Sequence, residues 1–305
     1  MADLDVLAAH PLVRRLLVPV LFVAFFLLFA VTTFPYDTLA RRLEVEAARA
    51  GGELTIASMG PTGILGLRAR DVKLKLPPSP GSETLPELHF ERADLMPDLF
   101  GLLLRKTGFG FAIDAYGGHA RGHAALSNDP RLPGLLSLRL DATELDLAAL
   151  PMKELAGVDL AGRVNVKVNL PVLQPAEAAS GTVTIGLKGG AVNGGSMQGF
   201  PIPKLLLGDL DSGLTVEKGI AKVDKAQTRG GDLDADVDGN IHLRPLLALS
   251  QAELHVRFRL AEKWLDQNVM IKSAMGLIQN ARQGDGSYVF TFSGPLTRMT
   301  PRPGR

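Results

Sequence analysis

Short runs in which apolar and polar residues alternate recur along most of this chain, and they constrain its fold more than any other feature. In Val72-Lys73-Leu74-Lys75-Leu76 the apolar residues are separated by single lysines. A β-strand directs successive side chains to opposite faces, so such a run predicts a strand with one apolar and one polar face. The same alternation occurs in segments 136–141, 163–170, 182–187, 254–260 and 288–293. One-sided alternation is typical of antiparallel sheets, because parallel sheets covered on both faces have continuous apolar runs.

The apolar face of this predicted sheet is the main candidate site. It must be buried against a second sheet, a helix or a ligand. A closed sandwich with a dry core and an open groove that holds acyl chains would place the same residues on the same side. The size of the domain favours the closed or nearly closed form, but both stay open at this point. The candidate lipid-facing or core positions are Val164, Val166, Val168, Leu170, Val183, Ile185 and Leu187.

Residues 16–34, LLVPVLFVAFFLLFAVTTF, form an apolar run without a charged residue. A transmembrane helix needs about 20 apolar residues, and the backbone must be helical to satisfy its polar groups in lipid. No A-x-A pattern follows the run, which argues for an uncleaved anchor and against a signal peptide. The predicted anchor positions are Leu16, Phe22, Phe25, Phe26, Phe29 and Phe34.

The orientation of this anchor is not decided by charge. Arg14 and Arg15 precede the run, but Arg41, Arg42 and Arg49 follow it closely. Long downstream domains can be exported regardless of such charges. We therefore expect residues 1–15 to be a cytoplasmic tail and the C-terminal domain to lie on the other side of the membrane.

The remaining chain divides into three further parts. Residues 35–52 predict a short amphipathic helix and connector, which Gly51-Gly52 ends and which lies on the membrane surface or covers the next domain. Residues 53–296 predict the antiparallel β domain, with a helix near 262–281 whose apolar stripe is Trp264, Ile271, Met275 and Ile278. Residues 297–305 are rich in Pro and Arg and predict a flexible tail.

Composition argues against several functional classes. The chain has no cysteine, which excludes disulfides and a thiol nucleophile. Its net charge is +1 and its basic and acidic residues are interspersed, which gives no argument for nucleic-acid binding. Ser196 lies in GGSMQG, which lacks the G-x-S-x-G spacing of a hydrolase nucleophile, and no dinucleotide or P-loop motif occurs. We predict a protein that is not an enzyme and holds no cofactor or metal.

Four aspartates at alternate positions are the first candidate metal site. Asp232, Asp234, Asp236 and Asp238 precede Gly239, as in a calcium loop. An EF-hand begun at Asp234 would need a Glu where this chain has Pro245. The wet face of an edge strand, where like charges discourage edge-to-edge pairing, accounts for the pattern better than a weak cation site does.

His119 and His123 have the spacing of two metal ligands on a helix, but GGHARGHAAL is too rich in glycine for one. On a strand the two imidazoles would share a face. No neighbouring carboxylate or third histidine in the sequence completes a site, and His89, His242 and His255 are isolated on alternating runs. We expect ordinary surface histidines.

Four segments together resemble the type II secretion system protein N family, with its AsmA-like architecture. They are FPYDTLARRL after the apolar run, GILGLRARDVKLKL, GNIHLRPLLALSQAELHVRFRL and the closing GDGSYVFTFSGPLTRMTPRP. The resemblance spans most of the chain, and its motifs are structural.

This resemblance implies an inner-membrane protein with a periplasmic β domain and no catalytic residues. The expected function is that of a non-enzymatic accessory component of type II protein secretion, which acts through contacts with other secretion components. AsmA-like relatives are linked to lipid traffic between membranes. The alternative expectation is therefore a lipid-binding protein that uses the apolar face of its sheet.

Overall fold

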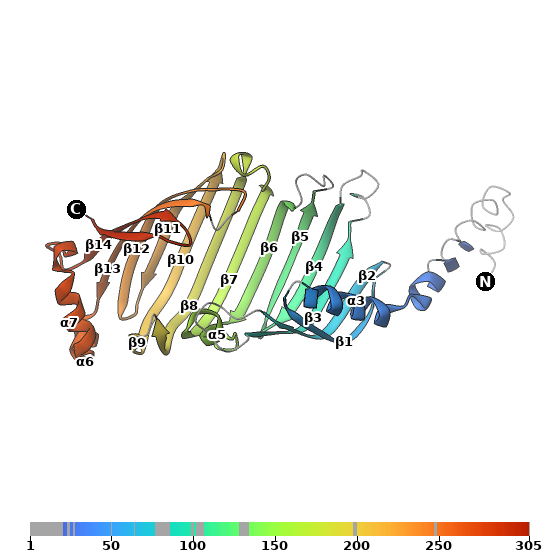
Figure 1. The fold of residues 1–305 in the computed structure, drawn as a ribbon, viewed down its shortest axis with the longest axis horizontal. Coiled ribbons are helices and arrows are strands. Elements are labelled where there is room, and N and C mark those ends of the chain that lie inside the picture. The colour runs from blue at the N-terminus through green and yellow to red at the C-terminus, as the bar shows by residue number, and fades with distance from the viewer. Residues whose placement is uncertain are drawn as a thin grey trace, which may run out of the picture.

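The computed structural model shows one long antiparallel sheet with short helices at its margins (Figure 1). It describes residues 21–22, 25–26, 28–49, 51–63, 65–76, 86–98, 101, 107–127, 134–197, 200–246 and 249–304. The fifteen strands of these ranges belong to one sheet, in which each strand is antiparallel to its neighbours. Fourteen of them follow chain order across the sheet, and β9 pairs with β8 outside that path.

The strands are β1 (Glu53–Thr62), β2 (Gly66–Lys75), β3 (Glu87–Pro97), β4 (Thr107–Ala115), β5 (Gly118–Leu126), β6 (Leu135–Asp146), β7 (Val158–Val172), β8 (Ser180–Met197), β9 (Phe200–Ile202), β10 (Leu205–Glu217), β11 (Ile220–Arg229), β12 (Leu233–His242), β13 (Gln251–Leu260), β14 (Tyr288–Pro295) and β15 (Thr300–Pro303). The helices are α3 (Tyr36–Arg49), α5 (Met152–Ala156), α6 (Glu262–Gln267) and α7 (Val269–Leu277), with 3-10 turns η1 (Ala176–Ala178) and η3 (Gln279–Ala281).

The expected antiparallel, mainly β fold is confirmed, but the preference for a closed or nearly closed form is wrong. The sheet path runs from β1 to β15 without a pairing between its two ends. Because all the described strands belong to this one sheet, they leave no second sheet to close a core. Figure 1 shows strands β4 to β10 side by side in a single layer.

Both edges of the sheet are protected. At the first edge α3 packs against β1. The helix ends at Arg49, and Gly51 follows it with a φ of +87°. Gly52 N–H then donates to Ala47 O at 3.0 Å, so the predicted Gly51-Gly52 stop is confirmed. At the other edge β15 contains Pro301 and Pro303, which cannot donate hydrogen bonds to a further strand.

The C-terminal part of the chain differs from expectation in one respect. The predicted helix near 262–281 is present as α6, α7 and η3, and Met275 of its apolar stripe is buried against Ala281 and Tyr288. By contrast, the predicted flexible tail contains β15, which pairs with β14 from Phe290 to Ser293. Pairing with an existing strand orders this segment despite its two prolines, since their ring nitrogens need no partner at an edge.

Part of the predicted membrane anchor falls outside the described residues. Residues 1–20, which include Leu16 and the predicted tail 1–15, are among these. The anchor positions Phe22, Phe25, Phe26, Phe29 and Phe34 are described and all are exposed. Within the described ranges, no helix combines the length and apolarity that a membrane crossing requires.

Candidate functional site: the apolar face of the sheet

The strand register brings the predicted apolar residues of β7 and β8 together. Val164 lies opposite Leu187, Val166 opposite Ile185, and Val168 opposite Val183. Leu170, the last of the seven, lies opposite Leu138 of β6. Because directly opposed residues of antiparallel strands share a face, these side chains form one apolar surface.

This surface continues across the whole sheet. Consecutive pairings from β1 to β15 trace an uninterrupted row of apolar residues and glycines: Pro61, Leu67, Leu95, Phe111, Gly122, Leu140, Val168, Val183, Leu214, Val223, Gly239, Leu254, Phe292 and Pro301. A second row on the same face is apolar except for Ser212: Met59, Ala69, Ala93, Ile113, Ala120, Ala142, Val166, Ile185, Ser212, Ala226, Val237, Val256, Phe290 and Pro303. We call the surface that these two rows define the apolar face.

The middle of the apolar face is shielded only in part. Val166, Val168, Val183 and Ile185 are half-buried, whereas Lys167 and Thr184 on the opposite face are exposed. The two buried apolar clusters of the described residues lie at the margins. One joins Ala179 to β10 and β11, and the other places α7 and η3 against β13 and β14. Over the central strands the apolar side chains are therefore shielded mainly by one another.

The opposite face is polar and is held by ion pairs near both ends of the sheet. Near the first end, Asp94 of β3 is 4% exposed and receives hydrogen bonds from Arg68 at 2.7 and 2.9 Å and from Arg92 at 2.5 Å. The hydrogen bonds from Arg68 and then Arg92 hold the pKa of Asp94 well below the ordinary 3.8 of an aspartate. This carboxylate therefore links β2 and β3 across their polar side.

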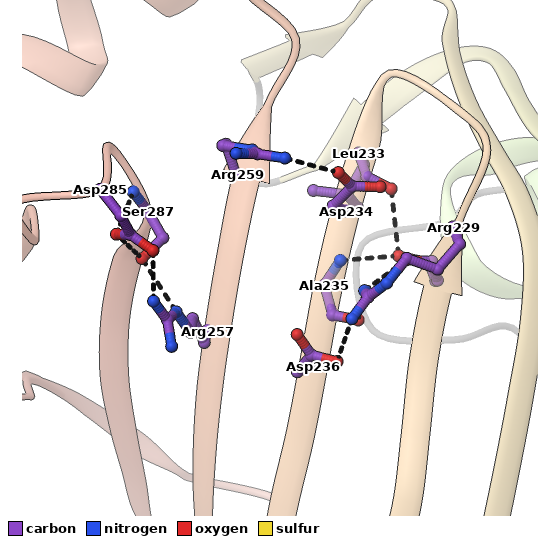
Figure 2. A network of polar contacts seen from close by, with 10 residues as sticks. Arg229, Leu233, Asp234, Ala235, Asp236, Arg257, Arg259, Asp285 and Ser287 are labelled. Carbon is purple, nitrogen blue, oxygen red and sulfur yellow. Dashed lines mark hydrogen bonds and ion pairs between the residues drawn. The ribbon is translucent and has the colours of Figure 1, made fainter.

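Near the other end, a second group of polar contacts involves β11, β12, β13 and the turn before β14 (Figure 2). Arg229 of β11 contacts Asp236 of β12 at 2.6 Å, and Arg259 of β13 contacts Asp234 at 3.2 Å. Arg257 pairs with Asp285, to which Ser287 donates from its hydroxyl at 2.7 Å and its N–H at 3.1 Å. These bonds from Ser287, with a smaller contribution from Arg257, lower the pKa of Asp285 to about 2.

The aspartate series is thus structural, but its predicted place in the sheet was wrong. Asp234, Asp236 and Asp238 lie on β12, which pairs on both sides with β11 and β13 and is not an edge. Asp232 precedes the strand, and its carboxylate accepts the N–H of Leu206 at 3.0 Å. Arginines of the flanking strands offset two of these charges, so a role in preventing edge-to-edge pairing is not needed to explain the aspartates.

The histidine prediction needs a similar correction. His119 and His123 lie on β5 and share its polar face, but each has a carboxylate partner that the sequence did not reveal. His119 Nδ1 lies 2.7 Å from Asp114, and His123 Nε2 lies 3.5 Å from Asp98. Among the described residues no three His, Asp or Glu side chains are placed to hold a metal ion.

Comparisons with known proteins give no family for this chain. No protein-family model, no curated protein and no solved structure matches it.

Bulges hide part of the apolar face from the sequence. Between β10 and β11 the register shifts, so Val223 and Ala226 share a face although they are three residues apart. Strict alternation therefore misses the contribution of these strands.

Proposed function

We propose that this protein binds the acyl chains of lipids along its apolar face and catalyses no reaction. The observation that carries the proposal is the pair of apolar rows that crosses all strands of the path without an ion pair or a charged residue. Removing apolar surface from water is worth about 25 cal/mol per Å². A hydrocarbon chain laid on half-buried Val, Leu and Ile side chains would gain this free energy over its whole length.

The dimensions support an extended ligand. Fourteen strands lie on the sheet path, which at about 4.8 Å per strand is roughly 60 Å of apolar face. Compact ligands usually occupy enclosed cavities of about 300–1,000 Å³. A long open surface instead suits flexible chains, which can follow it and leave their polar ends in water.

The residue types support hydrocarbon over aromatic ligands. From β5 to β12 the two rows contain aliphatic residues, glycines and one serine, while their aromatic residues lie on β4 and β14. Aliphatic side chains offer dispersion contacts without the directional preferences of aromatic rings. The central part of the face is therefore matched to saturated chains.

Photocrosslinking in living cells tests this proposal directly. A photoreactive phenylalanine would replace Val166 on the apolar face or Lys167 on the polar face of the same strand, in the full chain. After irradiation and denaturing purification, mass spectrometry should find lipid adducts at Val166 and none at Lys167. Absence of lipid from Val166, or equal labelling at both positions, would overturn the proposal.

A matched pair of double variants tests it a second way. Val183→Asp with Ile185→Asp places two charges on the apolar face of β8, and Thr182→Asp with Thr184→Asp places them on its polar face. The first pair should abolish co-purified lipid and the second should not. Circular dichroism must show the same β-sheet signal for both before the lipid contents are compared.

The secretion role stays a prediction implied by the resemblance, as does the location in the inner membrane with an exported β domain. Capture of type II secretion components by the full chain, together with lipid-free Val166 crosslinks, would favour that role over lipid binding. Protease accessibility of the β domain in spheroplasts tests the location.

A further inference from the structure

A hollow of about 440 Å³ lies where the turn between β10 and β11 meets the end of β12. Its lining residues include the basic side chains of Lys218, His242 and Arg244, the acidic Glu177 and the apolar Leu243. Lys218 and Arg244 carry two permanent positive charges against the one negative charge of Glu177, which leaves +1 with His242 neutral. The hollow therefore favours an anion.

The three basic side chains have no partner among the described residues. No hydrogen bond or ion pair joins the side chains of Lys218, His242 or Arg244 to the described part of the chain, although Arg244 donates its backbone N–H to Ser250 Oγ at 3.0 Å. Elsewhere on the sheet, Arg68, Arg92, Arg229, Arg257 and Arg259 are all paired with aspartates. The cations of the hollow are thus available to a ligand.

Lys218 also has an unusual backbone conformation. Its φ is +49° and that of Gly219 is +76°, as in the two-residue turns that favour Asn-Gly. A lysine adopts this left-handed conformation less readily than glycine or asparagine does, because its Cβ crowds the following carbonyl oxygen. Tyr116 occupies the corresponding turn position before Gly117, and there its hydroxyl accepts the N–H of His89 at 2.9 Å. At Lys218 no such contact accounts for the strain.

The hollow lies at the strand ends, where Ile220, His242 and Gln251 form a row on the polar face and Leu243 reaches the apolar face. Leu243 lines the hollow and also packs against the cluster of Ala179, Val216 and Ala221. Val216 lies opposite Ala221, and Ala221 opposite Ile241, one residue pair beyond the row through Val223. A ligand could therefore place a charged group in the hollow and a hydrocarbon chain on the apolar face.

We propose that this hollow binds the phosphate group of a lipid whose acyl chains lie on the apolar face. The inference rests on the proposed function and adds the headgroup chemistry to it. Lys218 and Arg244 would supply the charge and most of the hydrogen-bond donors, and the imidazole of His242 would add a ring N–H donor. Free phosphate shares this chemistry but lacks the apolar part.

The test compares two probes on the full chain in maltoside detergent: inorganic phosphate and dihexanoyl phosphatidic acid. Calorimetric titration should show at least tenfold tighter binding of the short-chain lipid. Lys218→Asn with Arg244→Gln should weaken that binding at least tenfold. Because Asn is favoured at this position of the turn, the Lys218→Asn substitution should not lower the melting temperature. Lys222→Gln, an exposed lysine of the same hairpin outside the hollow, should bind like the wild type.

The outcomes separate the two proposals. Unchanged lipid binding by the double variant overturns the headgroup site, while lipid adducts at Val166 would still support the proposed function. Equal affinity for the two probes identifies a free-phosphate site and also overturns the inference. If the full chain gives no lipid adducts at Val166 and does not bind the short-chain lipid, the proposed function and the headgroup site are both overturned.

Discussion

The Glu44 carboxylate accepts a hydrogen bond from the backbone N–H of Ile56 at 3.0 Å, which ties α3 to the outer edge of β1. An unpaired edge strand is a template for pairing with another chain. Here a side chain of the helix uses one of the free N–H groups, and the body of the helix covers others. Both contacts reduce the number of N–H and C=O groups on β1 that are free to pair with another chain.

Replacing Glu44 by Ala should lower the free energy of unfolding by about 1 kcal/mol, because the edge N–H loses its partner. It should also increase self-association, measured by light scattering after size-exclusion chromatography. Glu46→Ala on the same helix is the matched control, since Glu46 is exposed and forms an ion pair with the exposed Arg49 within the helix. Equal behaviour of the two variants would show that α3 does not protect the edge.

Asp94→Ala should be far more damaging. It leaves the guanidinium groups of Arg68 and Arg92 facing each other without their shared carboxylate. We expect a loss of roughly 2–3 kcal/mol, below the value for a fully buried pair because both arginines are partly exposed. Urea denaturation measures it. Asp141→Ala, whose contact with Lys167 is 3.9 Å long and exposed, should change stability by under about 0.5 kcal/mol.

The same carboxylate predicts a pH dependence. The pKa of Asp94 in the folded protein is lowered from 3.8, so the folded state binds this proton less readily than the unfolded state does. Its stabilising contribution is complete well above pH 3.8 and is lost as the pH falls below that value. Asp94→Asn should therefore unfold with a weaker dependence on pH between 4 and 2 than the wild type. An identical slope for both proteins would contradict this assignment.

The sequence predicts the strands of the middle and C-terminal parts well, because alternation is a local property. Val164 to Leu170 shows its face in seven residues without knowledge of any partner. The openness of the sheet is different, since it depends on whether strands far apart in the chain meet.

The candidate site shows the same division. The apolar residues of β7 and β8 can be found from the two-residue alternation alone. The pairing of Leu214 with Val223 cannot, because it depends on the bulge between β10 and β11. The ion-pair partners of Asp234, Asp236 and His119 come from neighbouring strands, and strand register is a tertiary property. Lys218 has no sequence signal beyond the glycine that follows it.

Trp264 anchors the C-terminal helices to the sheet. Its indole N–H donates to Lys204 O at 2.7 Å, and its ring is buried. Trp264→Phe should cost about 1 kcal/mol through the lost bond, and Trp264→Ala about 3–5 kcal/mol through lost packing. Hydrogen exchange should become faster in α6 and α7 before it does in β7. Uniform acceleration along the chain would indicate global destabilisation instead.

Gly122 lies in the first row of the apolar face, directly between Phe111 and Leu140. A Cβ at this position would overlap the ring of Phe111 and the backbone oxygen of Arg139, so the aromatic ring depends on the missing side chain. Gly122→Ala should therefore destabilise the protein by about 1–3 kcal/mol, since a backbone atom cannot yield as a flexible side chain can.

Gly186→Ala is the control, because a Cβ there meets no atom within 4 Å and its φ is not left-handed. That substitution should be neutral or stabilise by up to about 1 kcal/mol, as it restricts the unfolded chain. Thermal denaturation of the two single variants measures the difference, and equal melting temperatures would show that Phe111 does not need the space above Gly122.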